Sequence, residues 1–355
     1  MLEHLSVWTE LVSEDSIMDT VSDNQKAVNI GINVDRHRKK KLAAKKVAFY
    51  YGEMGEEKKA KAAAECGSYL QWTVRMDGTK RLTGANFCRL RMCPMCSWYL
   101  AKKRTRDLMK TLNEPEHRGK RLIFITLTVK NCKGEELKDT INMMYKALRS
   151  LTQKDKFLEK RTLGMVKKLE VTYNHETDEY HPHFHILCEV EPSYFNNPNL
   201  YVTHDILQKR WKRLCKLDYD PIVGIQTPKT KEATEMLNSE AVEGAVKDVC
   251  KYMAKDVDYA FSLETFKIFD EALRGRRLYT PTGSIKKTMA RLKMDEDSLD
   301  DNEDEQAVPD NPDVLTFTLR WHVNLYKVEV KRIETSKDKV LAGLALLGEY
   351  KAEPA

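Results

Sequence analysis

Three histidines alternate with other residues in the segment His181-Pro182-His183-Phe184-His185. Alternate side chains of an extended strand lie on the same face, so the three imidazoles are expected to point the same way. Imidazole is the commonest metal ligand among side chains, and two imidazoles on one strand can bind a single ion. The spacing therefore predicts a metal site on a sheet surface. A solvated strand face that merely carries histidines is the weaker alternative.

A carboxylate is expected opposite these histidines. Residues 163–174 alternate as a strand with Glu170 on the polar face, and a short polar segment follows that can close a hairpin. Pairing Glu170 with His185 makes the apolar faces of the two strands coincide, and directly opposed Cβ atoms lie about 5 Å apart. We therefore predict Glu170, His183 and His185 as metal ligands, with His181 as a fourth or outer ligand. Such a set leaves open positions for a substrate oxygen.

A helix expected over residues 239–255 carries a second set of reactive side chains. At 100° per residue, Asp248, Tyr252 and Lys255 fall on one stripe, beside an apolar stripe that can dock on a sheet. Tyrosine is a covalent nucleophile when its phenolate is stabilised, and Lys255 can supply that stabilisation. Asp248 can act as a base for water. An ordinary helix with polar side chains four residues apart is the alternative, and the metal site favours the catalytic interpretation.

Four of the eight cysteines lie close together in the sequence, at Cys66, Cys88, Cys93 and Cys96. Four thiolates can bind one tetrahedral zinc ion, and a closed four-sulfur site is structural rather than catalytic. Free thiols are the alternative. The flanks are basic and aromatic, so we expect the zinc to hold a surface that grips DNA, with Arg89 and Arg91 among the contacts.

The composition limits the class of protein. The 355 residues have a formal net charge of +6, and because residues 295–313 are strongly acidic, the remaining body is distinctly basic. A basic body is typical of nucleic-acid-binding proteins. No apolar run is long enough to cross a membrane, and the N-terminal residues lack the pattern of a secretory signal. We therefore expect a cytoplasmic protein with no membrane partner.

The elements expected from residue 121 onward follow the order β-α-β-β-α-β-α. This order predicts an α+β fold with a central antiparallel sheet and helices on one face, preceded by a cysteine module and a helical N-terminal region. The expected segments are a partly disordered, helical and basic region (1–60), a cysteine DNA-binding module (61–112), a catalytic domain (113–290), an acidic linker (291–314), and C-terminal strands with a helix that pack on the catalytic domain (315–355).

Several motifs occur in an order that resembles one known family. Residues 124–129 (FITLTV), 183–185 (HFH) and 252–255 (YMAK) resemble the three ordered motifs of HUH endonucleases. They are most similar to those of the replication initiator (Rep) proteins of rolling-circle plasmids. Residues 87–96 resemble a cysteine motif upstream of the catalytic domain in one branch of that family. The tyrosine follows the histidines, as in replication initiators, and the resemblance covers about residues 60–330.

The resemblance implies a ferredoxin- or RRM-like core that nicks one DNA strand at a plasmid origin and rejoins it, with Mg²⁺ or Mn²⁺. Tyr252 would attack a phosphodiester, which forms a 5′-phosphotyrosine and frees a 3′-OH primer. Asp248 occupies the position of an acidic residue, more often glutamate in the family, that activates water to end the round. The implied partners are origin DNA, as duplex or hairpin and as single-stranded nick site, and host helicase and replication proteins.

Three further residues are candidates for DNA contacts. Trp211, flanked by lysines and arginines, can stack on an extruded base or anchor its helix, and the second interpretation is favoured. Arg276 and Arg277 contact phosphate or are surface charge.

Two other functions remain open. One is a zinc-containing origin- or promoter-binding regulator without nuclease activity, and the other is a mononuclear iron oxygenase, which explains neither Tyr252 nor the cysteine module.

Overall fold

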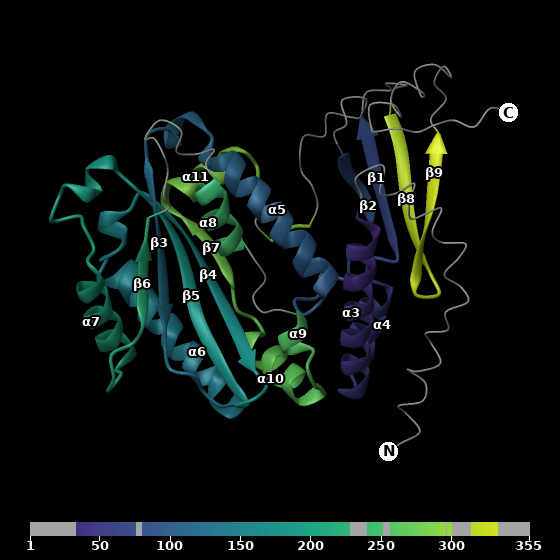
Figure 1. Cartoon of the computed structure of the whole chain (residues 1–355), viewed down its shortest axis with the longest axis horizontal. Coiled ribbons are helices and arrows are strands. Elements are labelled where there is room, and N and C mark those ends of the chain that lie inside the picture. The colour runs from purple at the N-terminus through teal and green to yellow at the C-terminus, as the bar shows by residue number, and fades with distance from the viewer. Residues whose placement is uncertain are drawn as a thin grey trace. The chain divides into compact units, whose positions relative to one another are not determined.

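The computed structural model describes residues 33–75, 80–227, 240–250, 256–295, 297–299 and 314–332 (Figure 1). The chain divides into two compact units: a first unit of residues 1–95 with 303–355, and a second unit of residues 96–302. Each unit has its own sheet. No helix within the described ranges is both long and apolar enough to cross a bilayer.

In its described residues, the first unit combines two helices with a four-stranded antiparallel sheet. The helices are α3 (Val34–Glu53) and α4 (Glu57–Glu65). Asn33 caps α3 because its side chain accepts a hydrogen bond from the backbone N–H of Arg36 at 2.8 Å. The sheet has the order β2-β1-β8-β9, with the strands β1 Tyr69–Arg75, β2 Lys80–Ala85, β8 Val314–His322 and β9 Leu325–Arg332.

The C-terminal strands belong to this first sheet. β8 pairs antiparallel with β1, from Tyr69 opposite Arg320 to Arg75 opposite Val314, and β9 pairs with β8. The expectation that residues 315–355 pack on the catalytic domain is therefore corrected for these strands. Hydrophobic alternation reveals that a strand exists, but it does not identify which distant strand is the partner. The expected C-terminal helix and most of the acidic linker lie outside the described residues.

The second unit contains a five-stranded antiparallel sheet of order β6-β3-β5-β4-β7. Four residues, 175–178, close the long hairpin between β4 and β5, and Asp178 has a φ of 50° in that turn. Aspartate tolerates this left-handed conformation better than most residues. The strands are β3 Arg121–Thr128, β4 Gly164–Asn174, β5 Glu179–Val190, β6 Val223–Gln226 and β7 Tyr279–Thr282.

Helices lie against both faces of this sheet (Figure 1). On one face, a buried cluster joins Val166 and Leu187 of the sheet to Leu108 of α5, Val246 of α8 and Ile285 of α11. On the other face α6 contacts β5, and α7 and α10 contact α6. The helices are α5 Pro94–Leu112, α6 Gly134–Arg149, α7 His204–Cys215, α8 Glu240–Cys250, α9 Asp256–Tyr259, α10 Leu263–Leu273 and α11 Gly283–Arg291, with short helical turns at Pro115–His117 (η2), Ser150–Lys154, Glu159–Arg161 and Pro192–Phe195.

The α+β class with a central antiparallel sheet is confirmed. The helices, expected on one face, cover both, and the central strand β5 shows why. Ile186 and Leu187 point to opposite faces of the sheet, yet both side chains are 0% exposed. A strand whose consecutive residues are buried needs cover on both sides.

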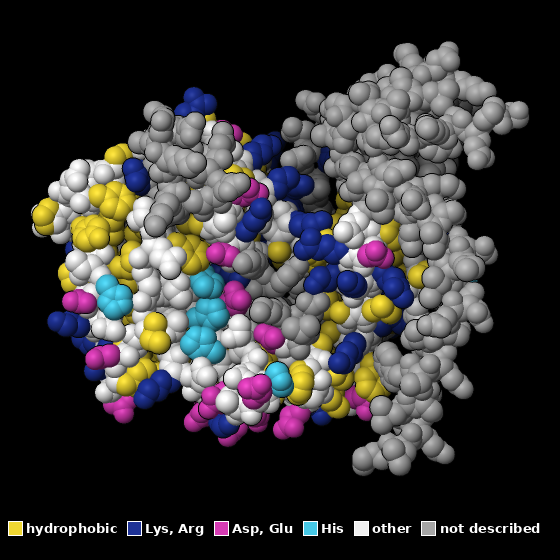
Figure 2. Space-filling view, in the orientation of Figure 1, with side chains coloured by type: hydrophobic (Ala, Val, Ile, Leu, Met, Phe, Trp, Pro, Cys, Tyr) yellow, Lys and Arg dark blue, Asp and Glu magenta, His cyan; other side chains and the backbone are white. Residues whose placement is uncertain are grey.

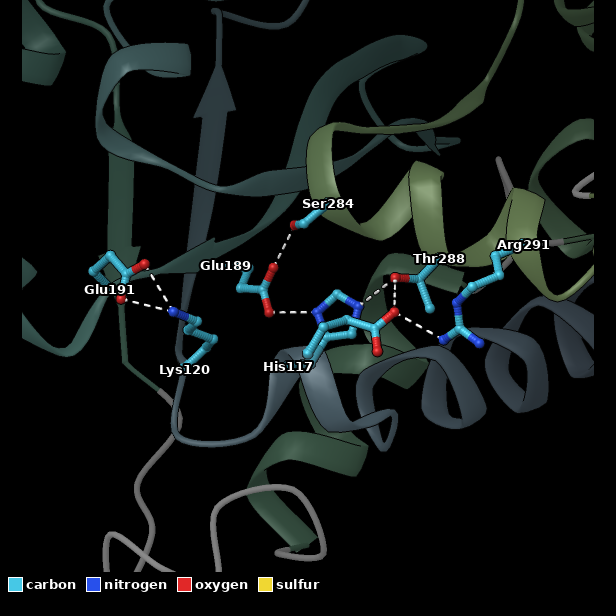
Figure 3. A network of polar contacts seen from close by, with 8 residues as sticks. His117, Lys120, Glu189, Glu191, Ser284, Thr288 and Arg291 are labelled. Atoms are coloured by element: carbon cyan, nitrogen blue, oxygen red, sulfur yellow. Dashed lines mark hydrogen bonds and ion pairs between the residues drawn. The ribbon is translucent and has the colours of Figure 1, made fainter.

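A buried polar network joins β5 to α11 and η2 (Figure 3). Nδ1 of His117 lies 2.5 Å from Oε1 of Glu189, and Nε2 lies 2.9 Å from the hydroxyl of Thr288. The hydroxyl of Ser284 donates to the other oxygen of Glu189. Because His117 and Glu189 are each only 1% exposed, these bonds satisfy polar groups that water does not reach. The network fixes α11 near the end of β5 that is remote from His181.

Candidate active site and cysteine cluster

The hairpin of β4 and β5 brings Glu170, His183 and His185 together on one face of the sheet. Glu170 and His183 are directly opposed, and His185 follows two residues later on β5. One ligand atom from each residue lies within 4.8 Å of the other two. Figure 2 shows histidine side chains in a column on the surface, with acidic side chains beside it. The structure thus assembles the three residues expected to bind the metal.

The register of this hairpin differs from the predicted one by two residues. Lys168, rather than Glu170, lies opposite His185. The turn sets the register, and it contains four residues, whereas the predicted pairing leaves six residues, 175–180, between the strands. A shift of two residues keeps every side chain on its predicted face, so Glu170 still lies beside the histidines.

Hydrogen bonds orient both imidazoles of the cluster. Nδ1 of His183 lies 3.1 Å from the carbonyl oxygen of His181, which can only accept, so Nδ1 carries the proton and Nε2 keeps its lone pair. Nδ1 of His185 lies 3.5 Å from the hydroxyl of Thr126, and its Nε2 lies 3.6 Å from Oε2 of Glu170. Partners of this kind fix the ring orientation of metal-binding histidines.

The electrostatics of the cluster favour its metal-binding protonation state. Burial lowers the pKa of His185 to about 4 and also lowers the pKa of His183, so both rings are neutral at neutral pH. Burial raises the pKa of Glu170, but the Lys168 ammonium and the two histidines outweigh it, and the net pKa lies below its ordinary value. Neutral imidazoles and an ionised carboxylate are the forms that bind a cation.

Lys168 was not predicted as part of the site, although strand alternation places it on the same face as Glu170. Its ammonium lies 2.7 Å from Oε2 of Glu170, and the side chain is only 3% exposed. It also donates to the backbone carbonyl of Asp248 at 3.4 Å, which links the sheet to α8. The strand alternation showed that Lys168 and Glu170 are neighbours, but it could not show the burial that makes their pairing important.

His181 lies outside the compact cluster. Its Nδ1 lies 2.9 Å from Oδ1 of Asn131, and its ring centroid lies 5.2 Å from that of His183. Burial lowers the pKa of His181 as well. This position suits an outer residue next to the ligands better than a fourth ligand.

The donor set fits the divalent cation that the resemblance implies. One carboxylate and two imidazoles on a single sheet surface leave several coordination positions for water or phosphate oxygens. Mn²⁺ accepts both donor types, and Mg²⁺ binds through few protein carboxylates together with substrate phosphates. Glu170, His183 and His185 are the residues that would hold the ion.

The helix α8 carries Asp248 toward this cluster. Burial is the main cause of the low pKa of His185. The negative charge of the Asp248 carboxylate acts to raise that pKa, so the two groups are close. Val246 and Val249 of α8 are buried in the core, as the predicted apolar stripe requires. Tyr252 and Lys255 lie outside the described residues. The second tyrosine of this segment, Tyr259, is 2% exposed and packs against Phe269.

The four clustered cysteines come together as predicted. The sulfur atoms of Cys66, Cys88, Cys93 and Cys96 all lie within 4.8 Å of one another. The Sγ atoms of Cys66 and Cys93 are 3.5 Å apart, close to the separation of about 3.8 Å that Zn–S bonds of 2.3 Å give in a tetrahedron. The backbone N–H of Cys88 donates to the Cys66 sulfur at 3.4 Å, which stabilises a thiolate. This arrangement fits a structural metal ion such as zinc.

A buried lysine lies beside the cysteine cluster. The ammonium of Lys41 donates to the carbonyl oxygens of Ala64 and Cys66 at 2.6 and 2.8 Å, and the residue is 0% exposed. Burial lowers the pKa of Lys41 to about 8, while the nearby cysteines act to raise it. The group therefore remains largely protonated at neutral pH. Lys41 was not predicted as part of the site, because the sequence shows only that it lies in a basic helix.

The remaining candidates for DNA contacts divide by exposure. Arg89, Arg91 and Arg277 are exposed, and Arg276 is half-buried. Trp211 is 0% exposed, and its indole N–H donates to the carbonyl of Thr128 at 2.8 Å. Trp211 is therefore the anchor of α7, and its alternative role as a platform for an extruded base is corrected.

Comparisons with known proteins agree with the motifs. Residues 79–327 match the model of the Rep_1 family, described as replication protein. The chain is similar to "Protein rep" of Bacillus amyloliquefaciens, with 36% identity over 261 residues that cover 69% of this chain and 75% of the relative. It is also similar to "Protein rep" of Lentilactobacillus hilgardii, with 30% identity over 275 residues that cover 75% of this chain and 86% of the relative. No solved structure matches the chain. The protein therefore belongs to the Rep_1 family of replication proteins, the initiators of rolling-circle plasmid replication.

Proposed function

We propose that the protein is a metal-dependent DNA nickase and ligase that initiates plasmid replication at the double-strand origin. One observation carries the proposal, namely the cluster of Glu170, His183 and His185 on one face of the sheet, beside α8. A divalent cation bound there would act as a Lewis acid on the scissile phosphate. The second unit would perform the cleavage, and the basic surface around the cysteine cluster would grip the origin.

In the proposed reaction, the phenolic oxygen of Tyr252 bonds to phosphorus as the bond from phosphorus to the 3′ oxygen breaks. The protein keeps the 5′ phosphate as a phosphotyrosine, the phenol loses its proton to solvent, and the 3′ oxygen takes a proton from solvent and leaves as a 3′-OH primer. Lys255 would offset the charge that develops at the phosphate. Asp248 would accept a proton from the water that ends the round.

Lys168 has a positioning role in this proposal. Its ammonium neutralises part of the charge of Glu170 and keeps that carboxylate ionised before the cation binds. Its contact with the carbonyl of Asp248 holds α8 near the sheet. Host helicase and replication proteins would act after the nick, because nicking alone does not unwind a duplex.

The decisive experiment incubates a supercoiled plasmid containing the origin with the protein and Mn²⁺. We expect relaxed DNA and a covalent adduct at the 5′ end, and mapping of the adduct should identify Tyr252. Tyr252→Phe should bind the origin with unchanged affinity and should not nick. Continued nicking by this variant would move the nucleophile elsewhere. No relaxation and no adduct with the unchanged protein would favour a zinc-containing origin- or promoter-binding regulator without nuclease activity.

Asp248→Ala separates the first step from the last. We expect this variant to nick the origin and form the adduct, because Asp248 does not supply the nucleophile. It should accumulate unterminated products in a replication assay, which gel electrophoresis would detect. Normal termination would remove Asp248 from the mechanism.

A further inference from the structure

A basic pocket of about 650 Å³ lies on the sheet face opposite the metal cluster. It is bounded by α6, by β4, β5 and β7, and by the segment that precedes β7. Consecutive side chains of a strand point to opposite faces of the sheet. Lys167 therefore faces away from its neighbour Lys168, and Phe184 faces away from His183 and His185. The thickness of the sheet thus separates this pocket from the proposed nicking site.

The lining of the pocket is strongly cationic. Five lining residues are basic and, in the part of the chain that the structure describes, none is acidic; the basic residues are Lys146, Arg149, Lys167, Arg276 and Arg277. Lys167 is half-buried, and this burial lowers the pKa of its ammonium. Gathering like charges in a partly buried hollow costs free energy that an anionic ligand would offset.

Aromatic and backbone contacts hold the walls of the pocket. The hydroxyl of Tyr145 donates to the carbonyl of Arg277 at 2.9 Å, and its ring meets Phe184 edge-on with centroids 5.1 Å apart. The guanidinium of Arg276 lies 5.8 Å from the Tyr145 ring and donates to the carbonyl of Lys138 at 3.1 Å. These contacts tie α6 to the segment before β7, so the cations are held in place before a ligand arrives.

We propose that this pocket binds single-stranded DNA, with phosphates against the cations and a base against Tyr145. An aromatic ring surrounded by basic side chains is the combination with which proteins bind single strands. The volume falls in the range of small-molecule pockets, about 300–1,000 Å³, so it admits one or two nucleotides but not a duplex. A free nucleotide has the same chemistry, and the experiment distinguishes the two sources.

The inference extends the proposed function, because it adds a second contact for a DNA strand on the face remote from the nicking site. It requires neither the cation nor Tyr252. Strand binding measured without added Mn²⁺ therefore tests the pocket separately from cleavage, whereas nicking with Mn²⁺ tests the proposed active site.

The test uses the full-length protein and a fluorescent oligothymidine strand that lacks the origin sequence. Lys146→Ala combined with Arg149→Ala removes two cations whose side chains are exposed on α6. Each phosphate contact to a single strand contributes about 0.7 to the slope of log affinity against log salt. Loss of two contacts should lower the slope by about 1.4 and weaken binding about 25-fold at 0.1 M salt.

The matched control combines Lys286→Ala with Lys287→Ala, which makes the same charge change at exposed positions of α11. Because exposed charges are screened beyond about 10 Å at this salt concentration, the control should change affinity by no more than about 2-fold. An equal loss of strand affinity in both double variants would show that only the net charge of the protein matters, and would overturn the proposal.

Photocrosslinking supplies a readout that needs no variant. A strand that contains 5-iododeoxyuridine should form an adduct with Tyr145 in the unchanged protein. Adducts found only elsewhere would overturn the proposal. Complete displacement of the strand by a deoxynucleoside triphosphate at the same molar concentration would assign the pocket to free nucleotides instead, and would also overturn it.

Discussion

Replacing Lys41 with methionine tests whether the buried ammonium offsets the charge of a metal-bound cysteine cluster. Four thiolates and one Zn²⁺ carry a net charge of −2, and a completely buried cation beside them makes that charge less costly. Methionine has similar length and no charge. The substitution also leaves the carbonyls of Ala64 and Cys66 without this donor.

The expected change in zinc affinity follows from the position of Lys41 next to the cysteines that would bind the ion. Removal of a group that contacts a metal ligand typically weakens metal binding about 10- to 100-fold, which corresponds to about 1.4–2.8 kcal/mol. We therefore expect zinc to bind Lys41→Met about 10- to 100-fold more weakly. The unmade hydrogen bonds should also lower the free energy of unfolding without metal, by about 1–3 kcal/mol for each buried carbonyl that finds no other donor.

The assay is competition for zinc between the protein and a chromophoric chelator at neutral pH. Lys39→Met is the matched control, because Lys39 is exposed on the same helix. Lys41→Arg keeps the charge and should recover part of the affinity. Zinc binding by Lys41→Met within 2-fold of the unchanged protein would refute the reasoning, as would an equal loss in Lys39→Met.

Two other predictions concern the second unit. Gly283→Ala should lower the free energy of unfolding by about 2–5 kcal/mol in urea titrations, because Gly283 has a φ of 62° and an added Cβ would lie 2.2 Å from the carbonyl oxygen of Leu163. Gly119→Ala, at a φ of 75° with nothing within 4 Å, should cost only about 1–2 kcal/mol, and an equal loss at both sites would contradict the steric argument. Hydrogen bonds from Arg291 and Thr288 hold the pKa of Glu116 at about 2, below its ordinary 4.5, so the ionised side chain stabilises the fold above pH 4.5 and loses this effect as the pH falls through about 2. Glu116→Gln should therefore be less stable than the unchanged protein at pH 6 and equally stable near pH 2, and a gap that persists at pH 2 would be evidence against this pairing.

The metal cluster shows how much of the site could be predicted from local sequence. The alternation of residues 181–185 fixed which side chains share a face, and that result survived an error of two residues in the register. The error arose because the turn has four residues and depends on Asp178 in a left-handed conformation. Periodicity specifies a face, whereas the register also depends on the geometry of the turn.

Long-range features could not be predicted in the same way. The pairing of β8 with β1 joins residues more than two hundred positions apart, and no local pattern encodes such a partner. The burial of Lys41 and of Trp211 likewise depends on packing, and their sequence contexts suggested only basic helices. The cysteine cluster was predictable because four thiols have few alternative uses when they lie this close.

The sheet that joins β1 to β8 has a consequence for how the chain folds during synthesis. β8 is an interior strand, and the ribosome makes it only after all of residues 96–302. The second unit has its own sheet and core, so it can fold while the first unit still lacks half of its strands. The sheet of the first unit therefore cannot be completed until translation has passed residue 322. Until then the edge of β1 that pairs with β8 is unpaired, and it can pair with the strands of other chains.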